Sequence, residues 1–311
     1  MIVCYGEILI DSFVDGEKKE EHVGGAPFNL VMAAKKVGAS VSFHGAIGND
    51  EAGKLIEDYF KKEKLPLSGL RIVPDQKTTI AQVTLKDGER DFRFLRDPGA
   101  DVFFDESSLN DIASGDIVHL GSLMLSSEKG REFARKVVKK TKELHKLLSF
   151  DINFRSDIFK DSAEALRIYE EFYPQADIVK FSSDELALFT KENDVDKALP
   201  LLKKGPKLVL VTLGKDGSLA YFREKTLPVP SVSVHPVDTT GAGDCFFGMF
   251  LSQIDSIGLE ELCAISSLMK SALRFSNIAA ALTTQKRGAL SALPTYKEVE
   301  KAMQENPLTR F

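Results

Sequence analysis

Residues 237–251 read VDTTGAGDCFFGMFL, a glycine-rich turn that runs directly into an apolar helical pattern. Gly241, Ala242 and Gly243 have almost no side chain, so a ligand can come close to their backbone. Free amides at the start of a helix bind anions, and the helix dipole adds to that attraction. Asp244 in the same turn is a carboxylate that can take a proton from an attacking hydroxyl. The segment therefore predicts a site for phosphoryl transfer to an alcohol.

This segment is not a P-loop, which has a Lys-Ser or Lys-Thr pair where this chain has Asp244 and Cys245. A carboxylate in the first turn of a helix often serves only to stabilise that helix. Here the carboxylate shares its turn with the anion site, so we favour a catalytic role for Asp244.

Upstream of this segment, short apolar runs alternate with longer helical patterns. Buried strands are predicted at residues 2–5, 41–46, 116–120, 147–152, 178–181 and 208–212. Helices are predicted at residues 27–37, 50–62, 128–144 and 163–173. Thr295 with Glu298, and Asp161 with Glu164, have the spacing of a capping box. This order predicts an α/β fold, one domain over residues 1–311 with a mainly parallel central sheet between helices.

Two regions, residues 9–22 and 71–97, break this alternation. Apolar and polar residues alternate there as in exposed antiparallel strands, with a turn predicted at Lys86-Asp87-Gly88. We expect these regions to form a small β-sheet that acts as a lid, although edge hairpins without a role are the simpler alternative. Because exposed strands seldom stay uncovered, pairing of lids in a homodimer is a further expectation.

Composition limits the classes of protein to consider. The 311 residues are 43% hydrophobic and 28% charged, with a net charge of -5, and basic runs such as Lys35-Lys36 are too short for a nucleic-acid surface. Cys4, Cys245 and Cys263 fit neither a disulfide framework nor a zinc site. No apolar run approaches the roughly 20 residues of a membrane span, and the N-terminus has no basic leader. We expect a cytoplasmic protein without membrane or nucleic-acid partners.

A second glycine motif, GGAPFN at residues 24–29, precedes a small-residue helical pattern. The glycine pair permits a tight turn and close backbone approach, and Pro27 suits the start of a helix. The spacing is not the GxGxxG of dinucleotide-binding proteins. Taken alone, the motif is equally well a simple turn between strand and helix.

Together these motifs resemble the ribokinase/PfkB-type carbohydrate kinases. The C-terminal signature of that family, DTxGAGD, matches residues 238–244, and its N-terminal GGxxxN signature matches residues 24–29, with GAIGND following at 45–50. The resemblance covers nearly the whole chain. It implies a three-layer ribokinase-like sandwich whose lid is a small β-sheet.

The resemblance also implies roles for the C-terminal signature. Asp244 is expected to be the general base, and the backbone of Gly241, Ala242 and Gly243 to stabilise the transferring phosphoryl group. The neighbouring Asp238 and Thr240 are expected to help hold a monovalent cation, with K⁺ the candidate.

On the sugar side, the resemblance implies that Asp11, Gly25 and Asn29 hold sugar hydroxyls. Asp and Asn suit this work because each can pair with adjacent hydroxyls. The segments FRFLRDPGAD and DINFR resemble fructokinases and 2-keto-sugar-acid kinases. They add four candidate substrate-binding residues: Phe94, Arg96, Asn153 and Arg155. Arginine can fork onto a carboxylate or phosphate, although a surface ion pair is the alternative for each.

On the nucleotide side, the turn in VTLGKDGSLAYF resembles one that borders the ATP phosphates, although the bare pattern indicates only a hairpin. The candidate ATP-binding residues are Lys180, Thr212, Gly214, Gly217 and Asn277. The family's NxxE motif, whose Glu orients Mg²⁺, is replaced by Ser182-Ser183-Asp184-Glu185. Glu185 is therefore the Mg²⁺ candidate, and its partner is left open. Mg²⁺ is expected because the ATP phosphates need charge neutralisation.

The function predicted from these residues is ATP-dependent phosphorylation of a small sugar at a primary hydroxyl, with fructose giving fructose 6-phosphate. The first alternative is a 2-keto-3-deoxygluconate kinase, in which arginines would clamp the acid. A second alternative, from another class, is a catalytically silent sugar or nucleotide sensor on the same fold. A nicotinamide dehydrogenase is disfavoured because its fingerprint is absent.

Overall fold

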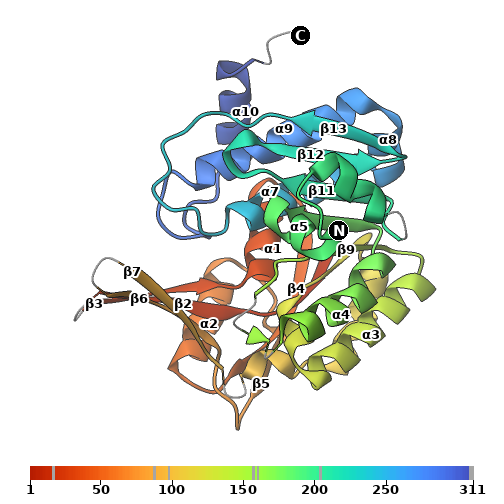
Figure 1. The fold of residues 1–311 in the computed structure, drawn as a ribbon. Helices are drawn as coiled ribbons and strands as arrows, with labels where there is room; N and C mark the ends of the chain where they lie inside the picture. Colours follow the sequence, from red (N-terminus) through yellow and green to blue (C-terminus); the bar gives the residue numbers. More distant parts are fainter. Residues whose placement is uncertain are drawn as a thin grey trace.

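The structure is a computed structural model that describes residues 1–15, 18–86, 89–96, 99–155, 158–159, 161–202 and 205–307. Its main element is a nine-stranded sheet (Figure 1). In order across the sheet, the strands are β13 (Lys225–Val229), β12 (Ser218–Phe222), β11 (Leu208–Thr212), β10 (Ile178–Ser182), β9 (Leu147–Asp151), β8 (Ile117–Leu120), β1 (Ile2–Tyr5), β4 (Val41–Gly48) and β5 (Leu70–Val73). All neighbouring strands from β11 across to β5 pair in parallel, and β12 and β13 are antiparallel at the opposite edge from β5.

Helices cover both faces of this sheet because its strands bury side chains on both sides. In β1, Ile2 and Cys4 belong to one apolar core, and Val3 and Tyr5 to the other, so the strand is an uninterrupted apolar run. The first core includes residues of α1 (Ala26–Lys36), α2 (Glu51–Lys62), α7 (Ala242–Ile257), α8 (Leu259–Ala264), α9 (Ser266–Thr283) and α10 (Tyr296–Glu305). The second includes residues of α3 (Glu128–Glu143), α4 (Ser162–Phe172), α5 (Ser183–Thr190) and α6 (Val195–Ala198). The predicted three-layer α/β sandwich is confirmed.

Helices α1 and α7 carry the two glycine motifs at their starts and pack closely against each other. Close packing is possible because α7 has Gly248 at the contact: a Cβ there would lie 2.1 Å from the carbonyl oxygen of Leu30. The contact brings the segments around residues 25–29 and 241–244, more than 200 positions apart in sequence, to one place in the fold.

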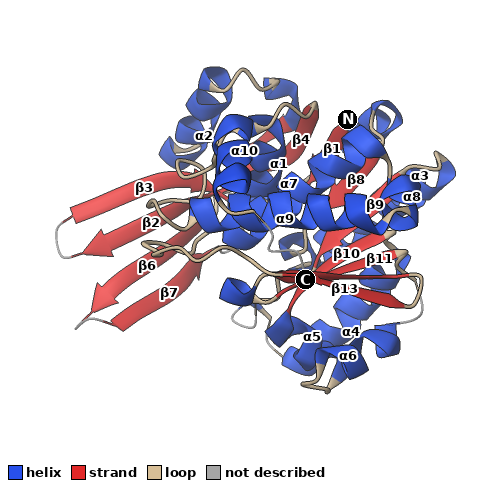
Figure 2. Cartoon of the chain, turned by 90° about the horizontal axis from the view of Figure 1, so that it is seen from above, coloured by secondary structure: helices blue, strands red, loops and turns tan. Residues whose placement is uncertain are grey.

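A second, four-stranded sheet projects from the main body (Figure 2). Its strands, in order, are β3 (Lys18–Gly24), β2 (Leu9–Asp15), β6 (Ile80–Lys86) and β7 (Glu89–Leu95). Two antiparallel hairpins are joined by the parallel pairing of β2 with β6. The expected small sheet is therefore present, but its central pairing is parallel. Asp87 and Gly88 of the predicted turn lie outside the described residues, as do Asp97 and Pro98.

The boundary predicted for the second part of the small sheet was wrong. Residues 71–73 belong to β5, which pairs in parallel with β4 at the edge of the large sheet. Leu70 and Val73 are buried while the two residues between them are exposed. A four-residue edge strand with this pattern cannot be told from a lid strand by alternation alone.

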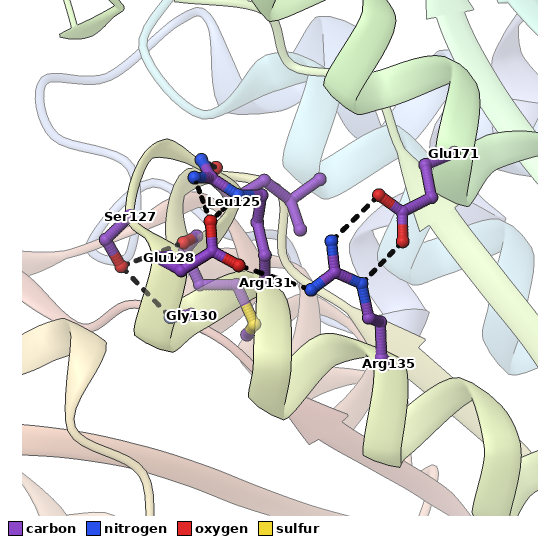
Figure 3. Close-up of polar contacts among 8 residues, drawn as sticks. Leu125, Ser127, Glu128, Gly130, Arg131, Arg135 and Glu171 are labelled. Carbon is purple, nitrogen blue, oxygen red and sulfur yellow. Dashed lines mark hydrogen bonds and ion pairs between the residues drawn. The ribbon is translucent and has the colours of Figure 1, made fainter.

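On the outer face, polar contacts join α3 to α4 (Figure 3). The α3 helix begins at a cap in which Ser127 Oγ accepts a hydrogen bond from the amide of Gly130 at 3.0 Å. Arg135 on α3 donates two hydrogen bonds to the carboxylate of Glu171 on α4, at 2.6 and 3.0 Å, and Arg131 pairs with Glu128. Glu128, Arg135 and Glu171 are exposed, so water and salt screen these pairs and they add little to stability.

The capping boxes and the cysteines complete the comparison with the predicted elements. The box of Thr295 with Glu298 is confirmed at the start of α10, whereas Asp161 caps α4 by accepting from the amide of Ala163. The three cysteines are free and buried. None of the helices in the described part of the chain combines the length and the apolar character that a bilayer-spanning segment needs.

Candidate active site

A cavity of about 770 Å³ lies at the carboxyl ends of the parallel strands, the edge at which open α/β sheets bind ligands. It is bounded by the small sheet, by the starts of α1 and α7, and by the ends of β10 and β11. Its walls include Glu7, Asp11, Gly25, Asn29, Phe94, Asn153, Arg155, Lys180, Ser182, Glu185, Thr212, Thr240, Gly241, Gly243 and Asp244. The two glycine motifs thus face the same space.

The start of α7 forms the turn that the sequence singled out. Gly241 is the N-cap residue and has φ 75°, a left-handed conformation that favours glycine. A Cβ at Gly241 would lie 2.5 Å from the Cβ of Ala289. No side chain caps this helix. The amide of Ala242 donates to the carbonyl oxygen of Thr239 at 3.3 Å, which leaves the amides of Gly241, Gly243 and Asp244 for an anion in the cavity.

Asp244 lies in the first turn of α7, half-buried at the edge of the cavity. Asn29 Nδ2 on α1 donates a hydrogen bond to Asp244 Oδ2 at 2.9 Å. Burial raises the pKa of Asp244, against the hydrogen bond from Asn29 and the positive charges of Lys180 and Arg155. A carboxylate with a raised pKa is a better proton acceptor than an ordinary aspartate, which suits a general base.

Asn29 is held by the turn that precedes α1. Gly25, the N-cap residue, has φ 112°, and a Cβ there would lie 2.7 Å from the carbonyl oxygen of Glu7. Asn29 is 4% exposed, and its Oδ1 has no hydrogen-bond partner in the described part of the chain. A buried amide oxygen on the wall of a polar cavity is a natural acceptor for a ligand hydroxyl.

Asp11 and Glu7 are two further carboxyl groups of the cavity. Asp11 is on β2, and burial raises its pKa to about 7, helped by the charge of Asp244 and opposed by Arg155. Glu7, which follows β1, is 2% exposed; burial raises its pKa to about 8. Glu7 Oε2 has no hydrogen-bond partner within the described residues. Glu7 is not among the residues predicted for the site; its one signal in the sequence is a carboxylate just beyond a buried strand.

Lys180 reaches the cavity from the middle of β10. Its ammonium lies 2.7 and 2.9 Å from the two carboxylate oxygens of Asp151, at the end of the neighbouring β9. Burial acts to lower the pKa of Lys180, but Asp151, Glu185 and Asp244 more than offset it, so the pKa is raised and the ammonium stays charged. The structure thus places a fixed positive charge beside the α7 turn.

Glu185 is the third residue of α5 and forms a capping box with Ser182, the N-cap residue. One carboxylate oxygen accepts from the amide of Ser182 and the other from the amide of Phe154, each at 2.7 Å. The carboxylate lines the cavity. No cluster of three or more His, Cys, Asp or Glu side chains suited to a metal occurs among the described residues, so a cation here would also need ligand or water oxygens.

Asp238 and Thr240 shape the loop before α7. Asp238 Oδ1 accepts hydrogen bonds from the amide and the hydroxyl of Thr240, at 3.0 and 2.7 Å. Asp238 Oδ2 accepts from the amide of Gly288 at 3.0 Å. The carboxylate therefore ties the loop to the 288–291 segment against which Gly241 packs.

Arg96 does not line the cavity. Its guanidinium pairs with Asp101, with Nε to Oδ1 at 3.0 Å and Nη2 to Oδ2 at 2.7 Å, and Nη1 donates to Ser126 Oγ. Asp101, which is fully buried, also accepts from Thr79. Because this guanidinium is committed to Asp101, the geometry gives no support to the expected contact between Arg96 and a substrate.

The nucleotide candidates divide into two groups. Thr212 lines the cavity, whereas Gly214 and Gly217 form the turn between β11 and β12 and are not among its lining residues. Asn277 on α9 is also not among the lining residues, and its amide nitrogen donates to the carbonyl oxygen of Val229 at 2.9 Å. On the opposite wall, Asn153 lines the cavity in a left-handed conformation with φ 37°, which is uncommon for a residue other than glycine.

The chain matches one protein-family model over residues 1–296, and that model describes the pfkB family carbohydrate kinases. Among curated relatives, probable fructokinase-4 of Arabidopsis thaliana is 36% identical over 98% of this chain and 97% of its own length. Fructokinase-2 of Solanum lycopersicum is 36% identical over 96% of this chain and 94% of its own.

Solved structures share the whole architecture. Fructokinase from Xylella fastidiosa with bound ATP has a TM-score of 0.90 at 29% identity, covering 98% of both chains. A fructokinase double mutant from Vibrio cholerae O395, in a form with fructose, ADP and potassium ion bound, has a TM-score of 0.86 at 29% identity, covering 96% of this chain and 97% of that one. Two of these matches therefore come from kinases with their nucleotide in place.

Proposed function

The chain belongs to the pfkB family of carbohydrate kinases, and from this premise we propose that it transfers the γ-phosphoryl group of ATP to the primary hydroxyl of fructose, giving fructose 6-phosphate. One observation carries the proposal. The carboxylate of Asp244 lies in the first turn of an uncapped helix and lines a cavity, where it accepts a hydrogen bond from Asn29, whose own acceptor oxygen has no partner among the described residues.

In the proposed reaction, Asp244 accepts the proton of the primary hydroxyl. The hydroxyl oxygen bonds to the γ-phosphorus as the bond from that phosphorus to the β–γ bridging oxygen breaks, and ADP leaves. The amides of Gly241, Gly243 and Asp244 hold the negative charge that the phosphoryl oxygens carry, while that of Ala242 donates within the turn. Closure of the small sheet over the cavity would exclude water and so limit hydrolysis of ATP.

Fructose is the proposed sugar because the relatives with the highest identity quoted above are named fructokinases, and the Vibrio cholerae protein is described with fructose bound. Asp11, Asn29 and the backbone of Gly25 are the proposed partners of its hydroxyls. All three line the cavity; Asp11 lies on β2 of the small sheet, whereas Gly25 and Asn29 lie at the start of α1. Phe94 on β7 also lines the cavity and offers an apolar surface to the sugar ring.

A second candidate is 2-keto-3-deoxygluconate. It is favoured by Arg155, whose side chain lines the cavity and can fork onto a carboxylate. Fructose has no carboxylate for Arg155 to bind. If fructose is the substrate, Arg155 would contact a phosphate group of ATP instead.

Two cations belong to the proposal. Mg²⁺ neutralises phosphate charge when bound, and Glu185 fits it best through water, because both its oxygens already accept backbone hydrogen bonds but each has a second lone pair. We assign K⁺ to the loop that Asp238 and Thr240 shape. Activity in K⁺ should exceed activity in a large organic cation, and equal rates would remove K⁺ from the proposal.

Two further parts of the proposal concern the whole molecule. The three free, buried cysteines suit a reducing compartment, so we place the enzyme in the cytoplasm. Strands β3 and β7 are the edges of the small sheet, and we propose that they pair in a homodimer. A monomeric mass by light scattering at working concentration would remove the dimer.

The test is a coupled assay of ADP release with a panel of sugars. We expect fructose to give the highest kcat/KM, with the product identified as the 6-phosphate. A preference for 2-keto-3-deoxygluconate would select the second candidate. Binding of a sugar without ADP release from any member of the panel would identify a sensor rather than an enzyme.

A further inference from the structure

Glu7 lies in the short turn between β1 and β2, where its side chain is enclosed and yet lines the cavity. It is 2% exposed. Two glycines leave the room that it occupies. A Cβ at Gly121, just after β8, would lie 3.0 Å from Glu7 Oε2, and a Cβ at Gly25 would lie 2.7 Å from the carbonyl oxygen of Glu7. The carboxyl group therefore lies in a close-fitting space at the wall of the cavity.

The protein satisfies this carboxyl group only in part. The backbone amide of Glu7 donates a hydrogen bond to it, whereas Oε2 has no partner among the described residues. The two oxygens can exchange places by rotation about the last torsion of the side chain, which is soft. Because buried polar atoms in native structures are hydrogen-bonded, a free carboxyl oxygen at a cavity wall indicates a partner on the ligand.

The groups around Glu7 leave it uncharged near neutral pH. The charged and titratable groups that interact with it are Arg96, Asp101, Asp244, Cys4 and Tyr169. Burial raises the pKa of Glu7 to about 8, and the negative charges of Asp101 and Asp244 add to this effect. Arg96, whose charge opposes it, is already paired with Asp101. Burial also raises the pKa values of the thiol and the phenol, so these two stay neutral.

The side chains proposed above to hold the sugar offer mainly acceptors. Asn29 donates through its amide nitrogen to Asp244, and its unpaired atom is the acceptor Oδ1. The carboxylates of Asp11 and Asp244, once ionised, can only accept. A cyclic sugar carries a ring oxygen that also can only accept, so the sugar needs a donor from the protein. The protonated carboxyl of Glu7 is such a donor in the wall of the same cavity.

We propose that Glu7 is a further substrate-binding residue, which as an uncharged carboxylic acid donates a hydrogen bond to an oxygen of the bound sugar. This inference rests on the proposed function. Glu7 makes and breaks no covalent bond and keeps its proton during phosphoryl transfer, in which the hydroxyl proton goes to Asp244. The contact couples sugar binding to protonation. Above about pH 8 the ionised Glu7 must take up a proton before it can donate, so sugar affinity falls as the pH rises.

The first test compares fructose binding to the wild type and to Glu7→Gln by calorimetry, from about pH 7 to about pH 9.5. Glutamine keeps the shape of the side chain and an N–H donor but does not titrate. We expect the dissociation constant of the wild type to rise by up to about tenfold per pH unit above pH 8, and that of Glu7→Gln to rise less. Asp11 and Asp244 titrate in both proteins, so the difference belongs to Glu7. Equal pH dependence in the two proteins would overturn the inference.

A second measurement follows the proton directly. Fructose binding at about pH 8.5, in buffers of different ionisation enthalpy, should show a net uptake of up to about one proton by the wild type and clearly less by Glu7→Gln. The matched control is Glu261→Gln, which removes the same kind of charge from an exposed position on α8 and should match the wild type. Uptake that is unchanged in Glu7→Gln would assign the proton to another group and contradict the proposal.

Glu7→Leu separates the sugar contact from the packing of this turn. Leucine has a similar size and no hydrogen-bonding group, so fructose affinity at about pH 7 should fall by about tenfold, a typical effect of one lost hydrogen bond. The value of kcat at saturating fructose should change far less. Glu7→Gln retains a donor and should bind fructose nearly as well as the wild type at this pH. If all three proteins bind fructose equally, the carboxyl is purely structural and the inference fails.

These outcomes can be told apart from the failure of the proposed function. If the wild type phosphorylates no sugar while fructose binding still takes up a proton through Glu7, the proposed function fails and the contact stands. If the wild type phosphorylates fructose while KM for fructose has the same pH dependence in Glu7→Gln, the proposed function stands and the inference fails. Where only 2-keto-3-deoxygluconate binds, the same titrations are made with that sugar.

Discussion

Two groups of carboxylates around the cavity differ in how completely the protein itself satisfies them. The loop carboxylates, Glu185 and Asp238, accept backbone hydrogen bonds on both oxygens. The cavity carboxylates are Glu7, which is buried, and Asp11 and Asp244, which are half-buried. All three have raised pKa values and few protein partners. The difference indicates that the first group holds loops in place, while the second keeps its hydrogen-bonding capacity for ligands.

The largest expected effect comes from the cavity carboxylate that reacts. Asp244→Asn retains the shape and the hydrogen-bonding capacity but removes the proton acceptor, so kcat should fall by about 10² to 10⁴. Titration calorimetry should find fructose and nucleotide binding largely retained. Turnover close to that of the wild type would place the general base elsewhere.

A smaller effect is expected from Asn29, which joins Asp244 to the sugar side. Asn29→Ala removes the hydrogen bond to Asp244 and the unused acceptor oxygen, and a hydrogen bond to a charged group is worth about 1.5–3 kcal/mol. The value of kcat/KM for fructose should therefore fall by roughly 10- to 150-fold, while KM for ATP changes little. If only the kcat/KM for ATP fell, Asn29 would not be a sugar-binding residue.

The pH dependence of stability provides a third way to separate the groups. Glu7 has a folded pKa of about 8 against 4.5 for an ordinary glutamate, so the folded state binds the proton more tightly. Its contribution to stability is complete below about pH 4.5 and is lost as the pH rises towards 8. In Glu7→Gln, the melting temperature should therefore change less with pH over this range. An unchanged slope would mean that Glu7 is ionised in the folded protein.

The smallest effect is expected from the loop carboxylate Glu185, and a second capping box provides its matched control. Glu185→Ala and Glu298→Ala each break a box, at α5 and α10, and each should lower the free energy of unfolding by about 1 kcal/mol. Only Glu185→Ala should also raise the Mg²⁺ concentration needed for half-maximal activity. The same Mg²⁺ dependence in both variants would make Glu185 a purely structural carboxylate.

The sequence predicted the large sheet well because strands buried on both faces are unbroken apolar runs; β1 and β11 begin and end at the predicted residues. The glycine motifs were also informative, since Gly25 and Gly241 have backbone conformations or contacts that a side chain would not allow. The four-residue strand β5 was misplaced because its two exposed residues resemble a lid strand.

Individual side chains were harder to predict from sequence. Arg96 looked like a ligand-binding arginine, but its partner Asp101 lies only five residues away and belongs to no motif. Asn277 is expected at the nucleotide, and its amide nitrogen donates to the carbonyl oxygen of Val229, so a contact with the nucleotide stays a prediction. Sequence position shows which residues reach an edge of the sheet, whereas the choice between a protein partner and a ligand depends on distances set by the rest of the fold.

The contacts of Asp101 have a mechanical consequence for the small sheet. Thr79 immediately precedes β6 and Arg96 immediately follows β7, and both bind the same buried carboxylate. The two ends of this hairpin are thus held together where they leave the main body. We therefore expect β6 and β7 to move as one rigid unit about that contact. The part of the hairpin beyond this contact can therefore differ in shape between relatives, while its base and the position of Phe94 at the cavity stay the same.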